Sequence, residues 1–89
     1  GLGDVYKRQV KNAAVRKVAK GIEVSWIPNE MKAVDGYSIY RDGQLIMKLQ
    51  IRDGQLPRTF VDAEGTVDNV YEVAVYNVIG KESAKVKAE

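Results

Sequence analysis

The feature that most constrains this fold is a run in which β-branched and aromatic residues alternate with other types. Residues 69–77 read Asn-Val-Tyr-Glu-Val-Ala-Val-Tyr-Asn, so Tyr71, Val73 and Val75 share one face, and Gly80 ends the run. Alternation with a period of two is typical of a strand that has two distinct faces. The sequence predicts that this strand lies at the centre of a small β-sandwich, with these three side chains pointing inward.

Shorter alternating runs, separated by turn-forming residues, fill the rest of the chain. We expect six further strands, the first of them interrupted near Ala13 and lying at a sheet edge, at residues 10–20, 22–27, 37–40, 45–50, 59–61 and 81–88. Asp42-Gly43 lies between two of these runs and predicts a tight hairpin turn. The pentapeptide Arg-Asp-Gly-Gln-Leu occurs at 41–45 and again at 52–56. Two similar turns explain this better than a repeat architecture, which needs several units.

Two of the runs also predict which side chains share a face. In the fourth strand, one face comprises Leu45, Met47 and Leu49, and the opposite face comprises Ile46, Lys48 and Gln50. In the last strand, Ser83, Lys85 and Lys87 face one way, and the opposite face comprises Ala84, Val86 and Ala88. Successive side chains of a strand point to opposite faces, which is the basis of both predictions.

Size and composition restrict the chemistry and the partners. The chain has 89 residues, which suits one domain, and it contains neither cysteine nor histidine. The net charge is +2, from 14 basic and 12 acidic residues, so we expect no nucleic-acid partner. No apolar run approaches the length of about 18 residues that a membrane helix needs, so we expect no membrane insertion.

No cofactor or metal ion is expected. Three loop acids, Asp62, Glu64 and Asp68, could in principle collect calcium, which takes six to eight oxygens. They lack the dense Asp-x-Asp spacing of a dedicated calcium loop. We therefore interpret them as turn-forming acids.

The first nine residues differ in character from the rest. The segment Gly-Leu-Gly-Asp-Val-Tyr-Lys-Arg-Gln resembles translated sequencing-adapter read-through, a string found at the starts of fragmentary metagenome-derived proteins. We therefore separate residues 1–9, as a non-native segment, from a domain at residues 10–89, and expect that domain to be a piece of a larger protein. The alternative is a natural flexible tail.

Four segments, taken in order, resemble a fibronectin type III domain over residues 10–89. They are Ile-Glu-Val-Ser-Trp-Ile-Pro at 22–28, Gly-Tyr-Ser-Ile-Tyr-Arg-Asp-Gly at 36–43, Phe-Val-Asp at 60–62, and Val-Ala-Val-Tyr-Asn at 73–77 followed by Gly80 and Ser83. The resemblance implies a seven-stranded antiparallel immunoglobulin-like β-sandwich with sheets A-B-E and C-C′-F-G and Trp26 between them. Counting back from Asn77 places the family's corner tyrosine at Asn69, whereas counting forward from Asp62 gives Tyr71. Whether Tyr71 makes the corner hydrogen bond is left open.

The tryptophan and two of the tyrosines are the candidate binding aromatics. Trp26 is in phase with Ile22 and Val24, so we expect it in the core and not as a sugar-stacking platform. Tyr40 and Tyr76 are out of phase with the inward residues of their strands. Both should face solvent on the same sheet, at opposite ends of it because the two strands run antiparallel. They are either ordinary exposed tyrosines or part of a partner surface, which would comprise Tyr40, Tyr76 and the loop from Asn77 to Lys81.

The residue types do not predict an enzyme. No serine has a histidine partner for a triad, and no Gly-rich phosphate loop occurs. The resemblance instead implies a non-catalytic accessory or spacer module, C-terminal in a larger exported bacterial protein at the cell surface or outside the cell, with neighbouring domains as partners. One alternative is a module that binds a protein or a glycan through its C-C′-F-G sheet. Another is a homophilic contact through edge strands.

Overall fold

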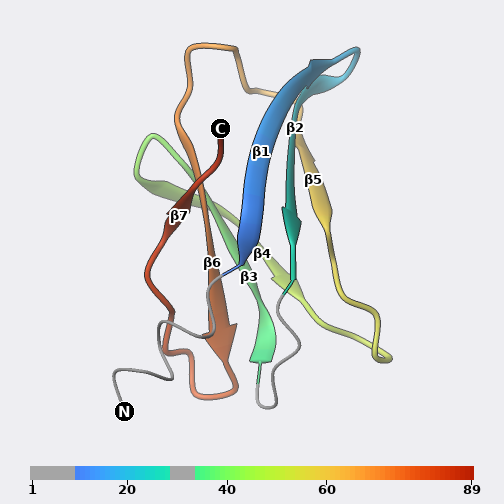
Figure 1. Ribbon diagram of the computed structural model, residues 1–89, viewed down its shortest axis with the longest axis vertical. Helices are drawn as coiled ribbons and strands as arrows, with labels where there is room; N and C mark the ends of the chain where they lie inside the picture. The colour runs from blue at the N-terminus through green and yellow to red at the C-terminus, as the bar shows by residue number, and fades with distance from the viewer. Residues whose placement is uncertain (1–9, 29–33) are drawn as a thin grey trace.

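The computed structural model describes residues 10–28 and 34–89, which form two antiparallel sheets packed face to face (Figure 1). Seven strands are present in the described residues: β1 (Lys11–Val18), β2 (Gly21–Ile27), β3 (Val34–Arg41), β4 (Gln44–Gln50), β5 (Thr59–Asp62), β6 (Tyr71–Asn77) and β7 (Val86–Lys87). One sheet has the order β1-β2-β5 and the other β4-β3-β6-β7. The predicted all-β sandwich and its two strand sets are confirmed, while the segment predicted to be foreign, residues 1–9, lies outside the described residues.

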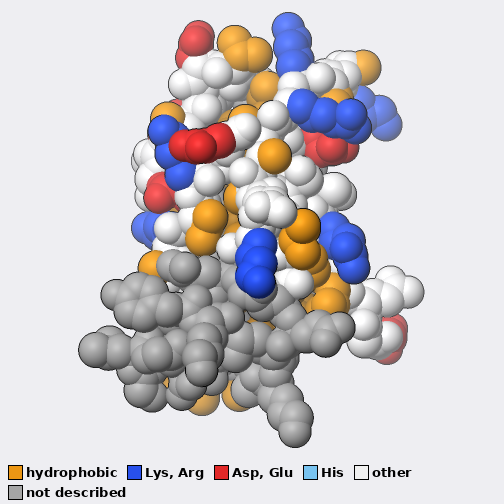
Figure 2. All heavy atoms as spheres, in the orientation of Figure 1, with side chains coloured by type: hydrophobic (Ala, Val, Ile, Leu, Met, Phe, Trp, Pro, Cys, Tyr) orange, Lys and Arg blue, Asp and Glu red, His pale blue; other side chains and the backbone are white. Residues whose placement is uncertain are grey.

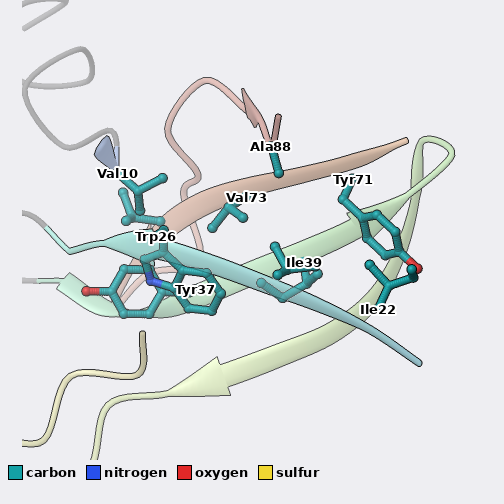
Figure 3. Close-up of a cluster of buried hydrophobic side chains, with 10 residues drawn as sticks. Val10, Ile22, Trp26, Tyr37, Ile39, Tyr71, Val73 and Ala88 are labelled. Carbon is teal, nitrogen blue, oxygen red and sulfur yellow. The ribbon is translucent and has the colours of Figure 1, made fainter. Parts of the chain in front are cut away.

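The core lies between the sheets and contains the side chains that alternation placed there (Figure 3). The predicted inward residues are all buried: Ile22, Val24, Trp26, Tyr37, Ile39, Tyr71, Val73 and Val75. The rings of Trp26 and Tyr37, from opposite sheets, have centroids 5.5 Å apart and planes tilted by 47°. Large aromatic side chains bury more area than any others, so this pair contributes heavily to the burial that holds the sheets together.

The first strand contains the predicted interruption. Its pairing with β2 changes register between Lys11 and Ala14, and Asn12 has a φ of 52°. Asparagine is one of the few residues that adopts this left-handed conformation at low cost. The bulge lies at the outer edge of the three-stranded sheet, where the strand was expected.

The two copies of the repeated pentapeptide form two similar turns, as predicted. Asp42 and Gly43 have φ values of 52° and 82°, and Asp53 and Gly54 have values of 55° and 73°. Positive φ at both central residues defines the type I′ turn, whose twist matches that of a hairpin. The first turn joins β3 to β4, and the second closes an isolated bridge between residues 52 and 55.

The expected face assignment in β4 is wrong at its start. Ile39 pairs with Met47 but Tyr40 pairs with Leu45, so Ile46 is an extra residue in the strand. A bulge of this kind reverses the alternation on one side of it. Ile46 therefore packs against the core, while Leu45 is exposed.

The predicted continuous strand at 81–88 is also wrong, because β7 contains only two residues. The hydroxyl of Ser83 accepts a hydrogen bond from the Val75 N–H at 3.0 Å, and the Ser83 N–H donates to the Val75 carbonyl at 2.8 Å. The Ser83 hydroxyl thus takes the place of a backbone carbonyl in the hydrogen-bond ladder with β6, and the pairing register of the last strand shifts. Ala84 is exposed as a result, whereas Ala88, predicted to share its face, is buried.

Candidate functional site

The two predicted surface tyrosines lie on the outer face of the four-stranded sheet, the side turned away from the core. Tyr40 of β3 pairs with Glu72, and Tyr76 of β6 pairs with Gly36. Gly36 and Tyr40 are four positions apart on one strand, about 13 Å at about 3.3 Å per residue. The tyrosines therefore share the face but not one platform, as expected. The prediction that both face solvent is wrong for Tyr76, which is only 8% exposed.

Tyr76 is buried because the neighbouring strand leaves room for its ring. A Cβ atom on Gly36 would overlap the Tyr76 hydroxyl, so the ring occupies the space that a side chain would take. The Lys48 ammonium covers the ring at 4.6 Å from its centroid. Alternation alone could not show this, since it gives the direction of a side chain and not what covers it.

Glu82 organises the other half of the outer face. Its carboxylate accepts a hydrogen bond from the Ser38 hydroxyl at 2.7 Å and a second from the Tyr40 hydroxyl. Ala74 lies opposite Ser38 on the intervening strand, and its methyl group is short enough for Glu82 to reach across. Sequence analysis missed Glu82, because a contact between residues 44 positions apart leaves no local signal.

The electrostatics of this cluster keep Tyr40 neutral. Burial, followed by the hydrogen bond to Glu82 and the charge of that carboxylate, raises the pKa of Tyr40 to about 12. The Lys85 ammonium lies 4.2 Å from the centroid of the Tyr40 ring. Each tyrosine of the outer face is thus covered by a lysine, in a contact worth about 0.5–1 kcal/mol at exposed sites. A sugar ring would have to displace that lysine before it could stack.

The remaining two residues of the predicted partner surface belong to the β6–β7 turn. The Asn77 side-chain oxygen accepts hydrogen bonds from the Ile79 N–H at 3.1 Å and the Lys81 N–H at 2.9 Å, so Asn77 shapes the turn. Lys81 is exposed. The tip of the turn presents Val78 and Ile79, which are 71% and 82% exposed. Both lie within the loop that sequence analysis assigned to the partner surface, although only the two ends of that loop were named as site residues.

A buried tie connects the two sheets at the opposite end of β6. The Tyr71 hydroxyl donates to Asp62 Oδ2 at 2.6 Å, and Arg41 Nη1 donates to the same oxygen at 2.7 Å. The question left open by the sequence is answered: the Tyr71 hydroxyl donates to a side-chain carboxylate of β5, whereas the corner motif has a bond to the backbone. Burial raises the pKa of Asp62, but the hydrogen bonds from Tyr71 and Arg41 outweigh burial and hold that pKa below its usual value.

The polar side chains with potential chemistry are engaged in holding the fold. The hydroxyl of Ser38 is fully buried against Glu82, and Asp62 is only 6% exposed. Within residues 10–28 and 34–89, no three His, Cys, Asp or Glu side chains gather closely enough to hold a metal ion. That part of the chain also has no helix of the length and apolarity needed to span a membrane.

The chain is similar in fold to parts of two enzymes of Clostridium perfringens. One structure is that of the M60 catalytic domain of ZmpC in complex with the sialyl T antigen, at 21% identity and a TM-score of 0.68 over 91% of this chain. The other is the spore cortex lytic enzyme SleM, at 13% identity and a TM-score of 0.69 over 90% of this chain. The chain spans 15% and 27% of those two chains.

The family comparison is more specific than these likenesses in fold. No curated protein matches the chain. Residues 8–89 match the model of the rhamnogalacturonan I lyases beta-sheet domain, so the match begins two residues before the predicted domain boundary. That match covers almost the whole chain. The chain therefore belongs to the family of rhamnogalacturonan I lyase beta-sheet domains.

Proposed function

We propose that this domain is a non-catalytic accessory module of a larger, exported carbohydrate-active protein, in which it acts as a stiff spacer beside neighbouring domains. The hydrogen bonds from Tyr71 and Arg41 to Asp62 carry the proposal. Asp62 is the most buried acidic residue of the described chain, and its carboxylate is used to join the two sheets. The family description supports it, since it names a β-sheet domain of lyases. The small share of each structural relative that the chain covers agrees with a module.

The loops at the same end of the sandwich are clamped as well, which a spacer requires. Asp42 Oδ2 accepts from the Asn69 amide at 2.6 Å, and Asp42 Oδ1 accepts from the Val70 N–H at 2.8 Å. These hydrogen bonds hold the pKa of Asp42 below its usual value, with the one from the Val70 N–H contributing most. The β3–β4 turn is thereby fixed to the start of β6.

The neighbouring domain would contact the end of the sandwich that carries the β6–β7 turn, at the lower end of the view in Figure 1. Val78 and Ile79 present an exposed apolar tip there. Contiguous exposed apolar surface marks sites of contact with another protein or domain.

The test has one arm on the chain and one on its parent protein. The 89-residue chain is incubated with rhamnogalacturonan I, and we expect no shortening of the polymer. In the parent protein, Val78→Ser with Ile79→Ser should lower the melting temperature of the adjacent domain. The matched control is Val61→Ser with Val67→Ser, which alters two exposed valines elsewhere. Polymer cleavage by the chain alone, or equal effects of the two pairs, would refute the proposal.

A second candidate function is binding of a protein or glycan by the outer face, through Tyr40, Tyr76, Asn77 and Lys81. The two lysines over the tyrosine rings favour it, because they present cations on one face to a ligand that need not stack on the rings. A glycan array or pull-down would compare the wild type with Tyr40→Ala and Tyr76→Ala. A signal that is equal for all three proteins would end this candidate.

We also propose that the domain is of the fibronectin type III type. The strand sets β1-β2-β5 and β4-β3-β6-β7 support this, since they match A-B-E and C′-C-F-G. The burial of Trp26 and Tyr71 in the core supports it as well. An alignment of homologues in which both positions vary freely would argue against it.

A further inference from the structure

An open hollow lies at the end of the sandwich where the β1–β2 hairpin approaches the β5–β6 connection, at the top of Figure 1. It has two adjoining parts of about 130 and 330 Å³, and four residues line both: Lys17, Ile22, Thr66 and Val67. The larger part falls within the range of about 300–1,000 Å³ that is common for small-ligand sites. The hollow is remote from the β6–β7 turn proposed above as the domain contact.

The rim of the hollow is cationic. Arg16, Lys17 and Lys20 line it, and no Asp or Glu is among its lining residues. Figure 2 shows Lys and Arg side chains gathered over this hairpin, at the upper right of the view. Arg16 pairs with Glu23 at 2.8 Å, whereas Lys17 and Lys20 form no ion pair with any residue in the described ranges. Since the whole chain has a net charge of only +2, the concentration of positive charge is local.

The walls of the hollow suit one face of a sugar ring. Val15, Ile22 and Val67 provide apolar surface, and Thr66 and Asn69 contribute polar groups beside it. A saccharide has the same two-sided character, with C–H groups on a ring face and hydroxyls around the ring. A cationic rim over such a wall therefore selects a sugar that also carries an anionic group.

Both walls are fixed before any ligand arrives. Thr66 N–H donates to the Asn69 side-chain oxygen at 2.7 Å, and Asn69 N–H returns a bond to the Thr66 carbonyl at 3.1 Å. On the hairpin side, a Cβ atom on Gly21 would overlap the Asp62 carbonyl, so the two backbones are in direct contact. A rigid site loses little conformational entropy on binding.

We propose that this hollow binds a carboxylate-bearing saccharide, with the carboxylate between the ammonium groups of Lys17 and Lys20 and the ring against Val67. The carboxylate belongs to a uronic acid or a sialic acid residue, and the experiment separates these sources. The inference rests on the proposed function only in that the parent protein must handle a polysaccharide. Charge-assisted hydrogen bonds of this kind are roughly twice as strong as neutral ones.

The test is calorimetric titration of the 89-residue chain with three probes: trigalacturonic acid, sialyllactose and neutral galactotriose. We expect at least one acidic probe to bind about tenfold more tightly than galactotriose, and the acidic probe that binds more tightly identifies the source. Raising the salt concentration should weaken that binding, since exposed charges are screened. Equal binding of the neutral probe, or no binding of either acidic probe, overturns the proposal.

Paired substitutions locate the site. Lys17→Gln with Lys20→Gln should weaken binding of the acidic probe at least about tenfold, since both charged donors to the carboxylate are removed and one charge-assisted hydrogen bond alone accounts for that factor. The control is Arg52→Gln with Arg58→Gln, which removes the same charge at the far end of the sandwich and should leave the affinity within about twofold. An equal loss in both proteins would overturn the proposal. That outcome leaves the polymer assay and the domain-contact variants unaffected, so it is distinguishable from failure of the proposed function.

Discussion

Removing the hydroxyl of Tyr71 tests the cross-sheet tie most directly. Tyr71→Phe keeps the buried ring and deletes only the donor that reaches Asp62 Oδ2 at 2.6 Å. A hydrogen bond to a charged acceptor contributes about 1.5–3 kcal/mol to stability. In a domain of this size each kcal/mol moves the melting temperature by about 4–8 °C, so a loss of about 2 kcal/mol lowers it by about 8–16 °C. Calorimetry or urea unfolding measures the change.

Tyr76→Phe is the matched control for this prediction. It deletes the same atoms from the same strand, at a tyrosine whose hydroxyl donates to no carboxylate among the described residues, and we expect it to cost about 1 kcal/mol or less. If Tyr71→Phe is no more costly than Tyr76→Phe, the bond to Asp62 does not hold the sheets together. The stiff-spacer interpretation would then lose its main support.

The pH dependence of the same variant gives a second measurement. The pKa of Asp62 is depressed in the folded state, so between the folded and unfolded values the native chain binds fewer protons than the unfolded chain. The stability from the tie is therefore complete above the unfolded carboxyl pKa of about 3.9 and is lost as the pH falls through the folded value. The difference in free energy of unfolding between wild type and Tyr71→Phe should have its full value at pH 7 and shrink below about pH 4. A difference that stays constant down to pH 2 would contradict this.

Three further substitutions give distinct outcomes. Gly65→Ala should destabilise the domain by about 1–3 kcal/mol in thermal unfolding, because the new methyl group would overlap the Tyr71 hydroxyl; unchanged stability would show that the loop can move aside. Tyr37→Phe should leave stability unchanged or raise it by about 1 kcal/mol, since its buried hydroxyl has no partner among the described residues; a clear loss would reveal a partner. Glu82→Gln should lower the pKa of Tyr40 from about 12 while burial keeps it above 10, as NMR of Cζ-labelled tyrosine would report; an unchanged value would exclude Glu82 as a cause.

The sequence predicted those parts of the fold in which apolar residues alternate with polar residues along a strand. In β2, Val24 and Trp26 alternate with Glu23 and Ser25, so the inward face is unambiguous. In β4, Leu45, Ile46 and Met47 are all apolar, and alternation cannot show which of them is the extra residue of a bulge. The shift at the last strand has a different cause, since it depends on one hydroxyl that replaces a backbone carbonyl.

The candidate site was less predictable than the fold for a related reason. The direction of Tyr40 and Tyr76 follows from the strand period, and their separation follows from antiparallel pairing. What covers them does not, because Lys48, Lys85 and Glu82 come from other strands or segments and meet the rings only after both hairpins have formed. The lysines of the first strand suit a sheet edge, where charge blocks pairing with other chains. Their second role, as the rim of a hollow, could not be predicted from the strand alone, because it depends on the β5–β6 connection lying beside the strand.

The two candidate surfaces of this domain differ in what a ligand must displace. On the outer face Glu82 already accepts hydrogen bonds from Ser38 and Tyr40, and a lysine covers each tyrosine ring. A ligand there must replace these contacts, so its net binding free energy is only the amount by which its own contacts are stronger. At the hairpin end Thr66 and Asn69 of one wall are bonded to each other, while the rim lysines have no ionic partner within the described ranges. Because an ammonium gains most from a carboxylate when it gives up no earlier partner, binding of an acidic sugar should be stronger at the hairpin end. Lys17→Gln with Lys20→Gln should therefore weaken that binding more than Lys48→Gln with Lys85→Gln, and the reverse order would assign the ligand to the outer face.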